Sequence, residues 1–125
     1  MYTENIQPDP PCRLEFYLTL RGDSPVEDFL GGLPDGARAK VAAWLGRLRE
    51  EGPGLRRPFA DVLEGPIREL RVSFGRLEIR VLYYCEGRSI VATNAFLKKT
   101  RKVPWGEIAR AKRRRLDWLG NFGEP

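Results

Sequence analysis

Four segments of the chain are predicted to be β-strands, and in the first three of them apolar and polar side chains alternate with the period of two that is typical of a strand. The four segments are residues 12–20, 66–74, 76–85 and 89–97. In the third segment, Leu77 and Ile79 alternate with Glu78 and Arg80. The breaks between the last three segments are short and contain glycine, so these strands should form an antiparallel meander.

Three other segments carry helix signals. Ser24 can cap a short helix over about 25–31, and a second helix is predicted over about 35–51 from the spacing of its apolar positions. A third helix is predicted over about 104–119. Its partly apolar face consists of Trp105, Ile108, Ala109, Leu116 and Leu119. Because the first two helices are joined so tightly, we expect them to form an antiparallel hairpin.

The predicted order is β-α-α-β-β-β-α, which indicates an α+β fold with helices packed on a mainly antiparallel sheet. A length of 125 residues fits one domain with its own core. We expect a flexible segment over 1–11, which holds three prolines, and a single domain over 12–120. No window is apolar enough to span a membrane and the N-terminus lacks a targeting pattern, so we expect a cytoplasmic protein.

The chain contains no histidine, and this absence excludes more types of catalytic site than any motif in the sequence does. Catalytic Ser-His-Asp and Cys-His groups are excluded, as is the histidine pair of many ribonucleases. The two cysteines, Cys12 and Cys85, cannot supply a metal site alone and are expected to be reduced, buried side chains. We therefore expect no metal and no cofactor. Chemistry on a nucleic acid would need arginine, lysine, tyrosine or carboxylates.

Positive charge is concentrated near the C-terminus. The net charge is +5, yet residues 98–115 alone hold nine basic side chains against one acid, Glu107. Such a cluster is typical of a surface that binds a phosphate backbone. A surface that binds an acidic partner protein would have the same pattern, and so would a helix face that is only solvated.

The polar face of the predicted meander carries Glu69, Arg71, Glu78, Arg80 and Tyr84. On an exposed sheet these side chains would form ordinary cross-strand ion pairs. The arginines also allow a functional interpretation, because a guanidinium binds phosphate with two hydrogen bonds and stabilises charge that develops during phosphodiester cleavage.

Several short motifs occur in a fixed order along the chain. They are Glu-Leu-Arg at 69–71, Ile-Arg-Val-Leu-Tyr-Tyr at 79–84, Phe-Leu-Lys-Lys-Thr at 96–100, Pro104, and Glu-Ile-Ala-Arg-Ala at 107–111. Residues 25–30 and the turn at 51–55 followed by Arg57-Pro58 add to the pattern. Over about residues 12–115 the chain resembles the phage-related, HigB-like branch of the RelE/ParE toxin superfamily.

This resemblance implies a RelE-like fold and the function of a toxin in a type II toxin–antitoxin system. Active RelE-like and HigB-like members cleave messenger RNA in the ribosomal A site without a metal, by attack of the ribose 2′-hydroxyl on the adjacent phosphate. The implied partners are the ribosome, mRNA and a cognate antitoxin, commonly a helix-turn-helix protein.

Carried over by position, the resemblance assigns roles to nine residues. The candidate catalytic residues are Arg80, Arg71, Lys98 and Tyr84. The candidate RNA-binding residues are Lys99, Arg101, Lys102, Arg113 and Arg114. Of these, Arg80 matches the position of a phosphate-contacting arginine in active relatives.

The chain departs from the pattern at two places, and these keep other functions open. Asn94 stands where many relatives have histidine, and no tyrosine follows Tyr84 to match the C-terminal tyrosine of RelE. A ParE-like inhibitor of DNA gyrase and a catalytically inactive nucleic-acid-binding relative are therefore the alternatives to an mRNA endonuclease.

Overall fold

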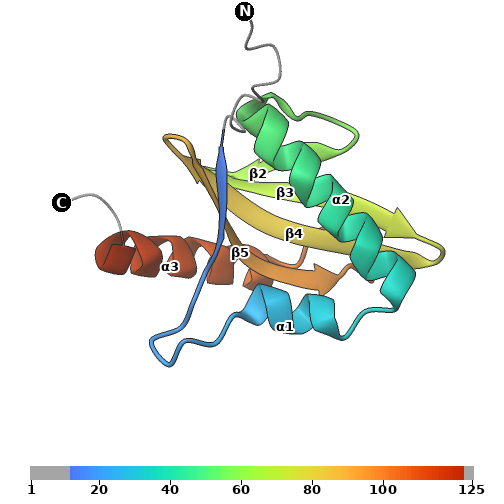
Figure 1. Ribbon diagram of the computed structural model, residues 1–125, viewed down its shortest axis with the longest axis horizontal. Helices are drawn as coiled ribbons and strands as arrows, with labels where there is room; N and C mark the ends of the chain where they lie inside the picture. The colour runs from blue at the N-terminus through green and yellow to red at the C-terminus, as the bar shows by residue number, and fades with distance from the viewer. Residues whose placement is uncertain (1–11, 123–125) are drawn as a thin grey trace, which may run out of the picture.

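The computed structural model describes residues 12–122, in which five strands and three α-helices follow one another (Figure 1). The strands are β1 (Arg13–Phe16), β2 (Ala60–Glu64), β3 (Ile67–Phe74), β4 (Leu77–Glu86) and β5 (Ser89–Leu97). The helices are α1 (Pro25–Gly31), α2 (Asp35–Glu51) and α3 (Trp105–Phe122), with a short 3-10 turn at Gly52–Gly54. No helix within 12–122 is both long enough and apolar enough to cross a lipid bilayer. The expectation for residues 1–11 lies outside the described residues.

The five strands form one sheet in the order β1-β5-β4-β3-β2. Strands β2 to β5 pair antiparallel, as the predicted meander requires, and β1 adds a parallel edge beside β5. Two-residue turns join β3 to β4 and β4 to β5, and each turn begins with a glycine at positive φ, Gly75 and Gly87. Glycine adopts this conformation without a Cβ clash, which is why these hairpins can be so tight.

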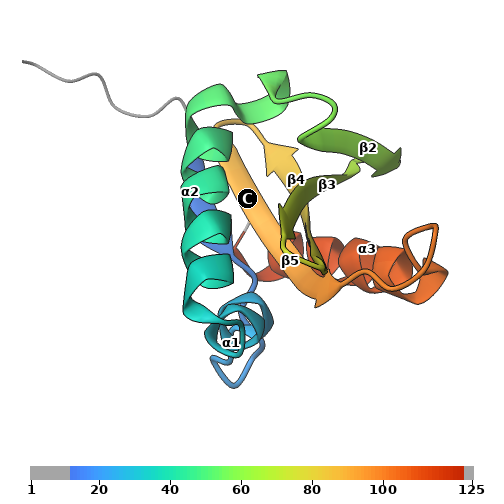
Figure 2. The ribbon, with the colours of Figure 1, turned by 90° about the vertical axis from the view of Figure 1, so that its right-hand side faces the viewer.

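Helices cover the two faces of the sheet in different ways (Figure 2). Helices α1 and α2 pack on one face over a large apolar core that includes Val41, Leu48, Leu70 and Val81. Helix α3 lies on the other face above a smaller cluster, with Ala111 and Trp118 as its buried residues. Since the sheet is wider than one helix, α3 leaves part of this second face uncovered.

The α+β fold is confirmed, and four local expectations are corrected. Strand β2 was not predicted, because its five residues lack a clear alternation and pair only along the edge of β3. Strand β1 ends at Phe16, where its pairing with β5 ends, rather than at residue 20. Helices α1 and α2 cross instead of lying antiparallel (Figure 2). On α3, Trp105 and Leu116 are exposed, and the face toward the sheet carries Ala111 and Trp118.

Candidate functional site

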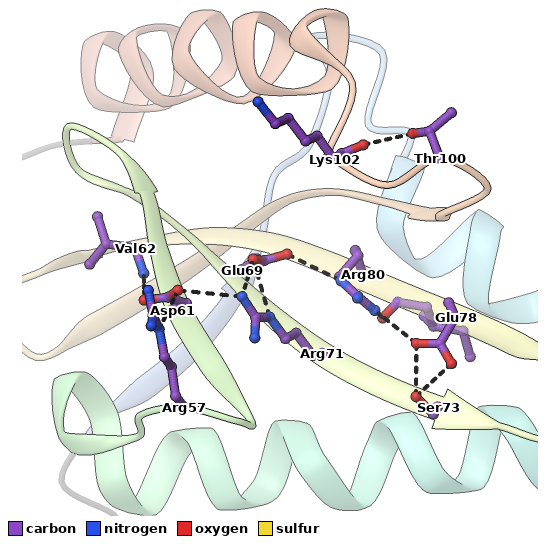
Figure 3. Close-up of polar contacts among 11 residues, drawn as sticks. Arg57, Asp61, Val62, Glu69, Arg71, Ser73, Glu78, Arg80, Thr100 and Lys102 are labelled. Atoms are coloured by element: carbon purple, nitrogen blue, oxygen red, sulfur yellow. Dashed lines mark hydrogen bonds and ion pairs between the residues drawn. The ribbon is translucent and has the colours of Figure 1, made fainter.

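The uncovered part of the second sheet face carries a row of alternating charges (Figure 3). The row crosses β2, β3 and β4, whose register places Arg71 directly opposite Arg80. Its members, from one end to the other, are Arg57, Asp61, Arg71, Glu69, Arg80 and Glu78. Two arginines side by side would repel each other, and the carboxylates between and beside them compensate that repulsion.

Glu69 is the central residue of this row. Its carboxylate lies 3.0 Å from Arg71 Nη2 on one side and 3.1 Å from Arg80 Nε on the other. The contact with Arg71 is a hydrogen bond, whereas the Nε–H of Arg80 does not point at the carboxylate, so that contact is an ion pair without a directed bond. Because Glu69 is only 4% exposed, its charge depends on the two arginines for compensation.

Arg80, the first candidate from the sequence, is buried instead of exposed. It is 8% exposed, and its guanidinium donates to the Ile79 carbonyl at 3.1 Å and contacts the Glu78 carboxylate at 3.5 Å. The Ser73 hydroxyl in turn donates its hydrogen bond to the Glu78 carboxylate, whose two oxygens lie 2.9 and 2.8 Å from the hydroxyl oxygen. Arg80 is thus fixed between two carboxylates.

Arg71 is more accessible, with 33% of its side chain exposed. Besides Glu69 it contacts Asp61 at 3.3 Å, and Asp61 is also 2.8 Å from Arg57 Nε. The hydrogen bond from Arg57 holds the pKa of Asp61 below its usual value, so the carboxylate stays ionised. Sequence reasoning missed Arg57 and Asp61, because both lie between the predicted helix over about 35–51 and the predicted strand over 66–74.

A groove of about 540 Å³ lies between this row and the loop that leads into α3. Arg57, Asp61, Glu69 and Arg71 line one wall, and the opposite wall carries Lys98, Arg101, Lys102 and Ile108. We call this feature the basic groove. It contains five cationic side chains against two carboxylates, Asp61 and Glu69, and is therefore a positive concavity of the kind that attracts phosphate.

The far wall of the basic groove is built from the end of β5. The Lys98 amide donates to the Glu78 carbonyl at 2.7 Å, which extends the pairing with β4 by one residue and sets the direction of the Lys98 side chain. The Thr100 hydroxyl donates to the Lys102 carbonyl at 2.6 Å and closes the following turn (Figure 3). Lys98 is half-buried, while Arg101 and Lys102 are exposed. Three candidates from the sequence therefore line the same groove as Arg71, namely Lys98, Arg101 and Lys102.

Tyr84 lies apart from the basic groove. It is buried beneath the C-terminal half of α3, and the Arg115 guanidinium is 5.4 Å from its ring centroid. Burial raises its pKa to about 12, with Arg115 opposing the shift. The structure therefore does not bring Tyr84 together with Arg71, Arg80 or Lys98.

The remaining candidates also lie outside the basic groove. Arg114 donates to the Thr93 carbonyl at 2.9 Å and covers the ring of Tyr17. Burial lowers its pKa. Arg113 is exposed beside Tyr17 at a separate hollow of α3, and Lys99 is exposed in the loop that follows β5.

Asn94 anchors the start of α3 to the sheet. Its side-chain amide donates to the carbonyl and the carboxylate of Glu107, at 3.2 and 2.9 Å, and its oxygen accepts from the Thr93 hydroxyl at 2.7 Å. It is 3% exposed, so both ends of the amide are satisfied inside the protein. Asn94 is a structural residue in this fold.

Within 12–122, no three cysteine or acidic side chains lie close enough to hold a metal ion.

Comparisons with known proteins agree with this architecture. Residues 28–116 match the family described as phage-derived protein Gp49-like. Among solved structures, a chain of the archaeal RelE–RelB complex from Pyrococcus horikoshii OT3 has the same fold, with a TM-score of 0.52 and 20% identity, over 74% of this chain and 99% of that one. No curated protein sequence matches. The chain therefore belongs to the Gp49-like family of phage-derived proteins, and the predicted resemblance to RelE-type toxins is confirmed at the level of the fold.

Proposed function

We propose that this protein is the toxin of a type II toxin–antitoxin system and that it cleaves messenger RNA on the ribosome. The observation that carries the proposal is the basic groove, in which Arg71 and Lys98 line the same concave surface. A ParE-like inhibitor acts by protein–protein contact alone and has no need of such a groove. Translating ribosomes would place the site of action in the cytoplasm.

In the proposed complex, consecutive RNA phosphates lie along the basic groove. Lys98, Arg101 and Lys102 make no ion pair with a carboxylate within residues 12–122, so their charges are available to phosphate. Arg71 has its guanidinium oriented by Glu69 and Asp61 and still keeps a third of its side chain exposed. A pre-oriented guanidinium binds a phosphate at a smaller entropic cost than a flexible one.

The proposed chemistry is attack of a ribose 2′-hydroxyl on the adjacent phosphorus, with loss of the hydroxyl proton to solvent water and cleavage of the bond from phosphorus to the 5′-oxygen. Arg71 would stabilise the charge that develops on the phosphoryl oxygens. Lys98 is the half-buried ammonium group of the basic groove, and we assign it protonation of the departing 5′-oxygen. The products are a 2′,3′-cyclic phosphate and a 5′-hydroxyl.

Arg80 has a different role in this proposal from the one that its sequence position suggested. Enclosed between Glu69 and Glu78, it neutralises the carboxylate that orients Arg71. Arg80 is therefore proposed as a positioning residue. Tyr84, Arg113 and Arg114 are left out of the reaction because they lie outside the basic groove.

We further propose a cognate antitoxin, of the helix-turn-helix type common in this branch. The similar archaeal chain was crystallised as a RelE–RelB complex, which supports a protein partner for this fold. Co-expression with the adjacent gene product should abolish toxicity, and the two proteins should elute together in gel filtration.

The test is induced expression in a bacterial host, followed by primer extension on several abundant mRNAs. Wild-type protein should arrest growth and produce cuts inside translated codons, and Lys98→Ala should lower cutting at least tenfold at equal protein level. The matched control is Arg49→Ala, which removes an exposed arginine on α2, on the opposite face of the sheet. Growth arrest with intact mRNA would instead indicate a gyrase inhibitor. Unimpaired growth would indicate an inactive relative.

A further inference from the structure

A second hollow, of about 310 Å³, opens beside the basic groove. It lies beyond the first residue of β2, where the edge of β3 is no longer paired, since the last bond across this edge joins the Arg71 amide to the Phe59 carbonyl at 2.8 Å. Its walls include Lys40 and Trp44 of α2, Phe59 before β2, and Arg71, Ser73 and Arg80 of the sheet. We call this hollow the edge pocket.

One wall of the edge pocket is a stacked aromatic pair. The rings of Trp44 and Phe59 are nearly parallel, with centroids 4.6 Å apart and an interplanar angle of 24°. Arg47 lies 5.3 Å from the Trp44 centroid, and Trp44 also packs against the apolar core. Phe59 is stacked on this supported ring and is still 39% exposed, so it offers an aromatic surface whose orientation is restricted by packing.

The rest of the lining is polar and carries both signs of charge, because the Glu78 carboxylate lies there together with the cations Lys40, Arg71 and Arg80. Lys40 donates to the Ser73 carbonyl, which blocks the open edge of β3 against pairing with another strand. Arg71 lines the edge pocket and the basic groove at the same time. A phosphate held by Arg71 would therefore place an adjoining nucleotide at the entrance of the edge pocket.

An aromatic platform next to a row of cations is the arrangement by which proteins bind single-stranded nucleic acid. The bases stack on the aromatic ring, while the backbone follows the positive charges. Volume and chemistry agree with this use, because the pocket is small and combines one exposed ring with a polar rim.

We propose that the edge pocket binds one nucleobase of single-stranded RNA, stacked on Phe59, while the neighbouring phosphate lies on Arg71. This inference rests on the proposed function and adds a base-binding subsite to it. The subsite contributes binding affinity and sequence preference, and the chemistry remains in the basic groove.

The experiment measures binding of short, fluorescently labelled single-stranded RNA by anisotropy. Phe59→Ala should weaken binding about tenfold, and Phe59→Tyr should restore it, because stacking on one aromatic ring is worth about that factor. The control is Phe74→Ala, which removes a phenylalanine that is 37% exposed at the end of β3 and does not line either hollow. Urea unfolding of each variant confirms that it is folded.

RNA that carries one abasic site, moved along the sequence, identifies the stacked base. At one position the abasic site should weaken binding to the wild type about tenfold and have no further effect on Phe59→Ala. Losses that simply add at every position, or equal affinity of Phe59→Ala and wild type, would overturn the subsite. If the subsite is overturned in this way and Lys98→Ala still weakens RNA binding, the RNA binds in the basic groove without using the edge pocket. A wild-type protein that binds no RNA would overturn the inference and the proposed function together.

Discussion

The carboxylate of Glu69 and the guanidinium of Arg80 form a buried ion pair, with Oε1 3.1 Å from Nε and the two side chains only 5% and 9% exposed. Both charges are removed from water, so each one depends on the other and on the flanking residues Arg71 and Glu78. The pair joins β3 to β4 directly behind the basic groove. It links the stability of the sheet to the orientation of Arg71.

Removing one partner of this pair should destabilise the protein strongly. Glu69→Ala leaves Arg80 buried beside Glu78 alone and should lower the free energy of unfolding by about 3–5 kcal/mol. Urea denaturation followed by circular dichroism measures the change. Glu50→Ala, at an exposed position on α2, is the control and should change it by less than about 0.5 kcal/mol. A loss below about 1 kcal/mol for Glu69→Ala would contradict the buried pair.

RNA binding should depend on salt through the unpaired cations of the basic groove. With three phosphates contacted by Lys98, Arg101 and Lys102, a double-logarithmic plot of affinity against salt should have a slope of about −2. Lys102→Ala should reduce the steepness by about 0.7, and Arg113→Ala, outside the basic groove, should leave it unchanged. An equal effect of the two variants would mean that the RNA follows α3 instead.

Asn94→Ala should affect stability rather than catalysis. The change leaves the Glu107 carboxylate and carbonyl without the amide donor and should cost about 1–3 kcal/mol of unfolding free energy. Cleavage per folded molecule should stay close to wild type, because the amide lies under α3. Asn121→Ala, at an exposed position of the same helix, is the matched control. Activity lost at unchanged stability would place Asn94 in the reaction.

Tyr84 should make stability depend on pH in the alkaline range. Its pKa is raised by burial from 10.0 to about 12, so the folded state holds the phenolic proton more tightly than the unfolded chain does. The resulting stabilisation is complete below about pH 10 and is lost as the pH rises toward 12, by roughly 2 kcal/mol.

The Tyr84→Phe variant tests this assignment. It should lose less stability than wild type between pH 10 and 12 and should be at least as stable near neutral pH, because the Tyr84 hydroxyl has no hydrogen-bond partner among residues 12–122. Tyr17 and Tyr83, whose pKa values are also raised, remain in the variant and keep part of the slope. Urea unfolding at several pH values gives the comparison, and identical slopes for the two proteins would refute it.

Local patterns determined much of the fold. Alternation predicted the meander, glycine marked its two turns, and the helix signals placed α1, α2 and α3 close to their observed bounds. These features depend on side chains that are neighbours in sequence, and for that reason they can be read without a structure. Strand β2 escaped prediction because an edge strand is stabilised mainly by its pairing with β3.

The sequence by itself determined which residue types are available: no histidine, a basic C-terminal region, and the motifs that relate the chain to its family. Only the tertiary structure decided which of them meet. The register of β3 and β4 places Arg80 between two carboxylates. The end of β5 and the loop after it bring Lys98, Arg101 and Lys102 into one groove with Arg71, and α3 covers Tyr84. The physical reason is that burial and the compensation of charge depend on contacts between distant strands, which a local pattern does not specify.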